Sequence, residues 1–352
     1  MKKVILLTFI CLLVAFTFYW FLPVVQYAEF PVNTDAKSRG IKDTVSNVQT
    51  HQTDTTLVTS KSSKNAKDNN VEKKELSDKD ALTIAKMLLS RVYNSETIDF
   101  NAEKELLTYL KTTNKEVVYQ FIVEKLQSAI KGNKNDDILI EYTLSLLVAI
   151  DTQRASEVFF GFVAEDDWQG SRAIYNVKKS IEKLNRGGQY TALAQQAFTI
   201  ANEENPFIGE LATSIARHAE AEQIEYLFGY IDEKYESKHM FVKRAMNTIH
   251  DESLVPHIAG YLTDNSTANI KNTVLNTLAN MGQYEATAAL IKWSSTQSKS
   301  SAEQVEKLFD IAVQRSPSTK RAIEKELHIQ SFVSSEVKLV IANAANKKTL
   351  KQ

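Results

Sequence analysis

The stretch from Ile270 to Gly282 carries an apolar pattern that recurs upstream and narrows the possible folds. Its apolar side chains stand at i, i+4, i+8 and i+11: Ile270, Val274, Leu278 and Met281. This spacing places them on one face of an α-helix. Gly282 is expected to end that helix, because a residue without a Cβ can adopt the left-handed conformation of a helix terminus. Similar patterns begin at positions 173, 207 and 241, so that successive starts lie 34, 34 and 29 residues apart. This period predicts one helical hairpin per repeat.

Helical periodicity continues from Leu76 toward the C-terminus, and no segment shows the alternation of a convincing strand. Further helices are expected over 98–110, 116–130, 136–150, 155–163, 172–184, 190–201, 303–313, 318–327 and 336–345. A single hairpin cannot bury its apolar face, whereas stacked hairpins bury a continuous core. The predicted fold class is therefore all-α, an α-solenoid of stacked antiparallel helix hairpins over residues 76–352. Its last three helices are expected to form a C-terminal cap with a polar outer side.

The stretch from Ile270 to Gly282 resembles the second helix of a HEAT-like repeat of the bilin-lyase type. That family's pattern has an apolar residue, Arg, two free positions, Ala-Ala, a free position, Ala-Leu-Gly, a free position and Ile-Gly. Lys271 stands here for the Arg, Leu278 and Gly282 agree, and Met281 replaces the Ile. The departures from alanine are Val274, Leu275 and Thr277. The resemblance covers about residues 170–295. Tetratricopeptide repeats share the period, but their Trp, Gly, Tyr and Pro pattern is not found in register.

The N-terminal region, residues 1–30, predicts a transmembrane signal-anchor. Lys2 and Lys3 precede a run from Val4 to Val25 that contains no charged residue. As a helix this run spans about 33 Å, which suffices for a bilayer core. The basic flank is expected to remain cytoplasmic. The alternative is a cleaved signal peptide, although the apolar run exceeds the usual length of its hydrophobic region.

Residues 31–75 have a different composition and predict a disordered polar linker. Ser, Thr, Asn and Gln make up 19 of these 45 residues, and no aromatic side chain is present. Such a segment cannot bury enough apolar surface to offset the entropy of ordering. As a flexible tether it would extend on the order of 35–40 Å.

The candidate partner-binding residues fall into two groups. In stacked hairpins the second helices usually line the concave side, which predicts a polar inner surface of Lys243, Arg244, Asn247, Lys271, Asn272 and Asn276. The alternative is that these residues are simply solvated helix faces. The loop 165–170 places Trp168 beside Asp166 and Asp167, and an aromatic side chain among acids can anchor a partner. Alternatively, the Trp packs over the seam between helices and the acids cap the next helix.

No catalytic, cofactor-binding or metal-binding constellation is predicted. His239, His250 and His257 are not spaced at i, i+4, the separation that puts two ligands on one helical face. The single cysteine, Cys11, lies in the apolar run, which excludes an intramolecular disulfide and a Cys-based zinc site. The net charge of −1, from 42 basic and 43 acidic residues, provides no overall field to attract nucleic acid.

These features together predict a single-pass protein of a bacterial inner membrane, with its bulk in the periplasm. Its expected function is that of a scaffold or adaptor for protein or peptide partners, envelope proteins in particular, without enzymatic activity or a cofactor. An alternative from another class is a lyase-like enzyme or small-ligand-binding solenoid related to the bilin lyases. A third is a structural regulator that signals across the membrane, although three residues before the anchor leave little cytoplasmic machinery.

Overall fold

The computed structural model describes residues 76–165, 167–231 and 236–347. Contacts divide the chain into two units, 1–70 and 71–352, and all the helices described below belong to the second. The predicted transmembrane segment 4–25 and the predicted linker 31–75 lie outside the described residues. In the part that is described, no helix combines the length and the apolar character needed to cross a bilayer.

The described residues are all-helical and contain no strand, which confirms the predicted all-α class for this part of the chain. The α-helices are α2 (Asp78–Tyr93), α3 (Phe100–Thr112), α4 (Glu116–Ser128), α5 (Lys134–Ile150), α6 (Gln153–Val163), α7 (Ile174–Leu184), α8 (Thr191–Ile200), α9 (Ile208–Arg217), α10 (Ala221–Phe228), α11 (Glu236–Met246), α12 (Val255–Ala259), α13 (Ala268–Met281), α14 (Tyr284–Ser295), α15 (Ala302–Arg315), α16 (Pro317–Glu326) and α17 (Ser335–Asn346). Short 3₁₀ turns, Glu252–Leu254 and Lys299–Ser301, precede α12 and α15.

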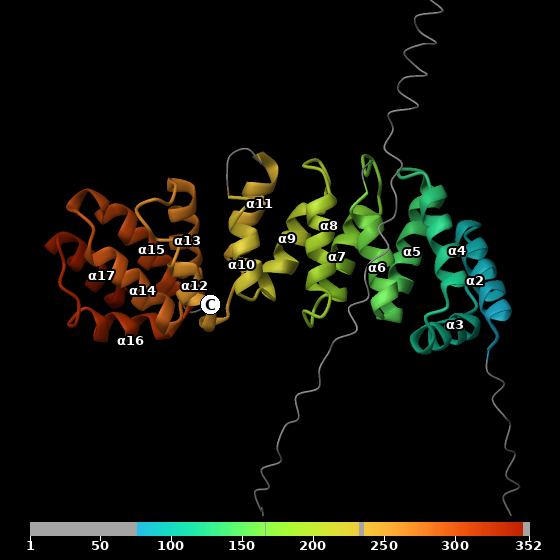
Figure 1. Ribbon diagram of the computed structural model, residues 1–352, viewed down its shortest axis with the longest axis horizontal. Coiled ribbons are helices and arrows are strands. Elements are labelled where there is room, and N and C mark those ends of the chain that lie inside the picture. Colours follow the sequence, from blue (N-terminus) through green and yellow to red (C-terminus); the bar gives the residue numbers. More distant parts are fainter. Residues whose placement is uncertain (1–75, 166, 232–235, 348–352) are drawn as a thin grey trace, which may run out of the picture. The chain divides into compact units, whose positions relative to one another are not determined.

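The helices pack in the order of the chain. Helix α9, for example, contacts α7, α8, α10 and α11, and α13 contacts α11, α12, α14 and α15. Figure 1 shows α2 to α17 following one another in this order from one end of the unit to the other. Their apolar faces form one core cluster that runs from Ala81 in α2 to Ala344 in α17.

The four helices that carry the repeated pattern lie side by side. Helices α7, α9 and α13 begin within two residues of the predicted starts, whereas α11 begins at Glu236, five residues before position 241. Each of these helices contacts the next in this series. Gly282 ends α13 with φ of +59°, as predicted, and its N–H donates to the carbonyl of Leu278. The similar apolar segments 227–231 and 258–262 lie at helix ends. Helices α10 and α12 end at Phe228 and Ala259, so each segment covers a helix end and the turn that follows.

Side-chain caps mark the starts of α2, α3, α5, α6, α13, α16 and α17. The hydroxyl of Ser77 accepts a hydrogen bond from the N–H of Asp80 and caps α2. The pair Asn205-Pro206 has the residue types of a helix cap and a first helical position, but α9 begins at Ile208. The Asn205 side chain instead accepts from the N–H of Phe207 and donates to the carbonyls of Val163 and Glu165. It thus holds the end of α6, and the helix starts after the turn.

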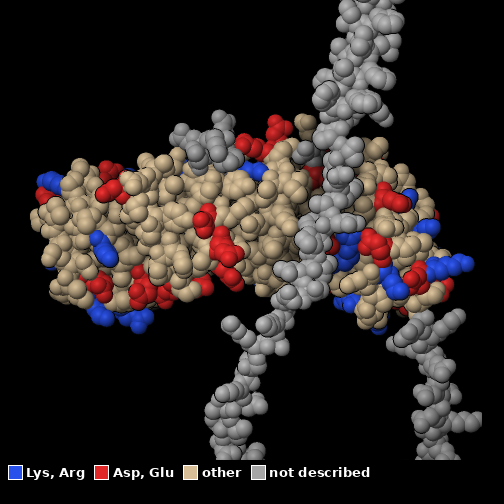
Figure 2. Space-filling model, in the orientation of Figure 1, with Lys and Arg blue, Asp and Glu red and all other residues tan. Residues whose placement is uncertain are grey.

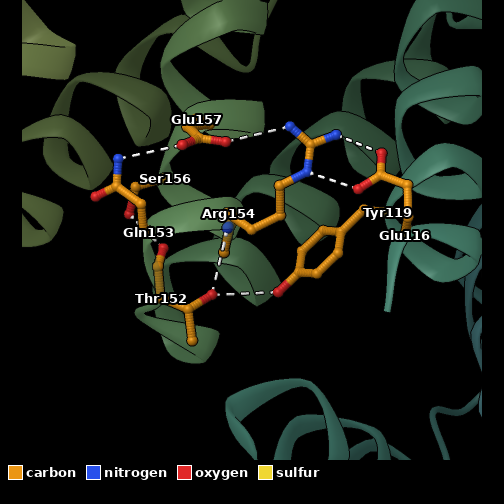
Figure 3. A network of polar contacts seen from close by, with 8 residues as sticks. Glu116, Tyr119, Thr152, Gln153, Arg154, Ser156 and Glu157 are labelled. Carbon is orange, nitrogen blue, oxygen red and sulfur yellow. Dashed lines mark hydrogen bonds and ion pairs between the residues drawn. The ribbon is translucent and has the colours of Figure 1, made fainter. Parts of the chain in front are cut away.

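A polar network joins α4 to the start of α6 (Figure 3). The guanidinium of Arg154 donates from Nε to Glu116 Oε2 at 3.0 Å and from Nη2 to Glu116 Oε1 at 2.5 Å. Its Nη1 also donates to Glu157 at 3.2 Å. The hydroxyl of Tyr119 lies 3.2 Å from that of Thr152, the residue that caps α6. These contacts fix the distance and rotation of one hairpin relative to the next.

The C-terminal end is less polar than predicted. The three expected helices are present as α15, α16 and α17, and α17 buries Val337, Ile341 and Ala344. The surface at this end nevertheless exposes Leu339 on α17 and Val333 in the preceding turn, which are 59% and 75% accessible. The other exposed side chains of α17, among them Lys338, Asn343 and Asn346, are polar, as expected of a cap.

Candidate functional site

A groove with a volume of about 670 Å³ crosses α7, α9 and α11. Its lining comes from the three adjacent helices and the turns at their C-terminal ends: Lys178, Lys179, Glu182, Asn185, Arg186, Gly209, Glu210, Thr213, Ser214, Arg217, His218, Phe241, Arg244, Thr248 and His250. We call this surface the α7–α11 groove. It contains many charged side chains and one aromatic ring.

The bottom of the α7–α11 groove is set by close contacts between neighbouring helices. The ring of Phe241 on α11 approaches Gly209 on α9 so closely that a Cβ at Gly209 would lie 2.9 Å from its Cδ1 atom. At the end of α7, the buried amide of Asn185 donates to the hydroxyls of Ser214 at 2.8 Å and Thr191 at 3.2 Å. The carbonyl oxygen of Asn185 accepts from the N–H of Tyr190 at 2.9 Å. The groove therefore rests on a rigid base.

Two ion pairs cross from α7 to α9 within the groove. Lys178 Nζ lies 3.1 Å from Glu210 Oε1, and Arg217 Nη1 lies 2.7 Å from Glu182 Oε1. These pairs engage both acidic side chains of the lining. The other cations of the lining, Lys179, Arg186 and Arg244, have no carboxylate partner among the described residues. The groove therefore carries an excess of positive charge on a chain whose net charge is −1.

Acidic and basic side chains both occur on the face of the molecule drawn in Figure 2, in small groups separated by uncharged surface.

The predicted polar inner surface is only partly brought together. Arg244 lines the α7–α11 groove, whereas Lys243 on the same helix donates to Asn269 Oδ1 at 3.0 Å. Asn247 is half-buried, and its Oδ1 has no hydrogen-bond partner in the described part of the chain. Lys271 donates to the carbonyl of Asp264 at 3.2 Å.

Two of the predicted residues line a different hollow. Asn272 and Asn276 border a space of about 380 Å³ between α13 and α15. The amide of Gln304 on α15 donates to Asn272 Oδ1 at 3.2 Å, and Asn276 donates to the carbonyl of Asn272 at 2.8 Å. These amides are exposed but already bonded within the protein.

Trp168 is a packing residue, which corrects its assignment as an anchor for a partner. Its side chain is 2% exposed and meets Phe162 and Phe207 edge to face at centroid distances of 5.3 and 4.7 Å. Its indole N–H donates to the carbonyl of Glu165 at 3.0 Å. Of its predicted neighbours, Asp167 is exposed with φ of +66°, and Asp166 lies outside the described residues.

Two buried ionisable side chains near this region have structural partners. Asp137, at the start of α5, accepts from Gly132 N, Ser171 Oγ and Arg172 N at 3.1, 2.7 and 2.8 Å, and so ties two loops together. On α11, the buried ammonium of Lys238 donates to the carbonyls of Phe198 and Thr199 at the end of α8, at 2.8 and 3.3 Å. Burial lowers the pKa of Lys238 below its usual value.

The described residues contain no group of three or more His, Cys, Asp or Glu side chains placed to hold a metal ion. His218 and His250 both line the groove. His218 lies against Gly188, where a Cβ would approach its ring to 2.9 Å.

Sequence reasoning identified Arg244 but missed most of the groove. A usable signal was present, since Glu210 and Arg244 stand three residues after the repeat starts at 207 and 241. Ser214 and Thr248 likewise share a position seven residues after those starts. A comparison of Arg244 with the residues at the same position of the neighbouring repeats would have identified the groove. Comparison with protein-family models, with curated proteins and with solved structures finds no match to this chain.

Proposed function

We propose that the chain is a membrane-anchored scaffold whose HEAT-like α-solenoid binds protein or peptide partners on the extracytoplasmic side of a bacterial inner membrane. The α7–α11 groove carries this proposal. It extends over α7, α9 and α11, which lie side by side, so it offers an elongated surface and not a closed pocket. Extended surfaces of this kind are what stacked helical repeats use to hold protein segments.

The helix packing supports the solenoid part of the proposal. Most helices contact the helix two positions further along the chain, so a core forms between neighbours without contacts from distant segments. This is the arrangement expected of stacked hairpins. The membrane part rests on the sequence, in which an uncharged run from Val4 to Val25 follows two lysines.

A small-ligand site is the competing function, and the groove volume gives it a specific basis. About 670 Å³ falls within the range of roughly 300–1,000 Å³ that ligand pockets occupy. Such pockets are lined mainly by apolar and aromatic side chains. The α7–α11 groove is instead lined mainly by charged and polar side chains. This composition suits a polar protein segment better than a chromophore.

The test is site-specific crosslinking in the full-length, membrane-anchored chain. A photo-crosslinking amino acid at Thr213, a half-buried residue of the groove, should capture a protein partner in intact cells. The same amino acid at Lys292, an exposed residue of α14 outside the groove, is the matched control. Mass spectrometry identifies the products. The scaffold function is refuted if no site yields a reproducible protein adduct and the purified protein carries a small molecule.

The orientation is tested separately with reporters fused after Gln352. A periplasmic reporter should be active and a cytoplasmic reporter inactive, because the lysines before the apolar run should keep the N-terminus in the cytoplasm. The opposite result would overturn the topology but leave the binding surface in place.

A further inference from the structure

We infer that the occupant of the α7–α11 groove is an extended acidic segment of a partner protein. This inference rests on the proposed scaffold function and specifies the chemistry of its binding surface. Three observations support it: the unpaired cations of the lining, the position of these cations on the two outer helices of the groove, and the ring of Phe241 in the lining.

The unpaired cations of the lining indicate that the occupant is negatively charged. Glu182 and Glu210 are both engaged in ion pairs with other residues of the lining. Arg186 and Arg244 are exposed and have no acidic partner among the described residues. The Lys179 ammonium lies over the exposed ring of Tyr175, 4.2 Å from its centroid, and leaves its N–H donors available. Carboxylates accept hydrogen bonds from both kinds of cation, and guanidinium groups bind them in two-point geometry.

The distribution of these cations indicates an extended occupant. Lys179 and Arg186 belong to α7 and the turn after it, whereas Arg244 belongs to α11, with α9 between them. Neighbouring helix axes lie about 8–10 Å apart, so α7 and α11 are separated by roughly 16–20 Å. An extended chain advances about 3.3 Å per residue and crosses this distance in about six residues.

The middle of the groove suits the backbone and aliphatic parts of such a segment. Thr213 and Thr248 are half-buried hydroxyl residues of the lining, and the ring of Phe241 is held against Gly209 at its base. The hydroxyls of Thr213 and Thr248 donate to the carbonyls of Gly209 and Ala245, so their oxygens can accept from the N–H groups of a peptide. The ring offers an apolar surface to the methylenes of Glu side chains. The groove therefore fits a protein segment that carries acidic residues at intervals.

The experiment measures binding of a fluorescein-labelled oligoglutamate peptide of about twelve residues, long enough to cross the groove. The protein is the full chain in detergent micelles, and the measurement is fluorescence anisotropy. An oligoglutamine peptide of the same length is the neutral control. In the test variant, Lys179→Gln, Arg186→Gln and Arg244→Gln are combined. The matched control combines Lys104→Gln, Lys292→Gln and Arg321→Gln, which removes the same charge from exposed residues outside the groove.

The groove variant should bind oligoglutamate roughly tenfold more weakly, as expected for the loss of three partly exposed charge pairs. The control variant should change affinity less than about twofold, because distant exposed charges are screened by salt. Circular dichroism checks that both variants retain the native helical content. The oligoglutamine peptide should not bind measurably.

Three results would overturn the inference. The first is equal weakening in both variants, which would show that binding follows net charge alone. The second is absence of oligoglutamate binding by the native chain at low salt. The third is a groove variant that loses binding to vesicles containing anionic lipid, or to inorganic phosphate, and keeps its binding to the peptide. The scaffold function fails differently, because its test is the recovery of any protein adduct, whatever the charge of the partner.

Discussion

Replacing Gly282 with alanine should destabilise the fold at the junction of α13 and α15. Gly282 has φ of +59°, and a Cβ there would lie 2.7 Å from Arg315 Cβ and 3.1 Å from the Ala312 carbonyl oxygen. The left-handed conformation costs an alanine about 1 kcal/mol. Forcing extra volume against packed atoms typically costs about 1–3 kcal/mol more. The expected loss in the free energy of unfolding is therefore about 2–4 kcal/mol.

Substitutions at two other glycines distinguish the conformational contribution from the steric one. Gly170 has φ of +78° but no atom within 4 Å of an added Cβ, so Gly170→Ala should cost only the conformational term of about 1 kcal/mol. Gly161 lies inside α6 and also has open space around it, so Gly161→Ala should stabilise by about 0.5–1 kcal/mol through helix propensity.

Urea denaturation followed by far-ultraviolet circular dichroism measures these differences in the full chain. Hydrogen exchange should also become faster in α13 and α15 of the Gly282→Ala variant and remain unchanged at the far end of the chain, in α2. If Gly282→Ala and Gly170→Ala lose the same stability, the steric part of the reasoning is wrong. If neither loses stability, the left-handed assignment fails as well.

Three further predictions concern charge and packing. The pKa of Lys238 is lowered by burial, so just below the usual value of 10.5 the unfolded chain holds more protons and stability rises with pH. The urea midpoint should therefore rise more between about pH 7 and about pH 10 in the native chain than in Lys238→Met, and equal changes would contradict this. The Lys299 ammonium holds the pKa of Glu336 at about 2, below its usual 4.5, so its carboxylate stabilises the fold above pH 4.5 and that contribution is lost as the pH falls toward 2. Glu336→Gln should thus be less stable than the native chain at neutral pH and converge with it in acid; a difference independent of pH would refute the ion pair. Trp168→Ala should lose about 3–5 kcal/mol in thermal or urea unfolding and Trp168→Phe clearly less, whereas a loss below about 1 kcal/mol would show that the ring is not packed.

The helices were predictable because their signals are local. Apolar spacing located the repeated helices, and Gly282 and Ser77 marked ends that the structure confirms. Predictions failed where the partner lies far along the sequence. Asn205 resembles a helix cap, but its side chain bonds to carbonyls at Val163 and Glu165, and this contact delays the start of α9.

The candidate site was less predictable for the same reason. A cation is available to a binding partner only if no carboxylate of the neighbouring helix pairs with it. The ion pair between Lys178 and Glu210 cannot be predicted from the sequence alone. Trp168 illustrates the opposite error, because its acidic neighbours suggest exposure whereas Phe162 and Phe207 enclose its ring. The repeat register is the one sequence signal that relates Arg244 to the rest of the groove.

The packing of helices in chain order also bears on how the protein can be made. Hydrogen bonds that join separate helices connect residues a few dozen positions apart, as between Tyr284 and Glu326, which lie 42 positions apart. A segment emerging from a ribosome or a translocation channel can therefore complete its contacts soon after it appears, without waiting for the C-terminus. Folding can proceed in the direction of synthesis, with each finished hairpin serving as the template on which the next one docks.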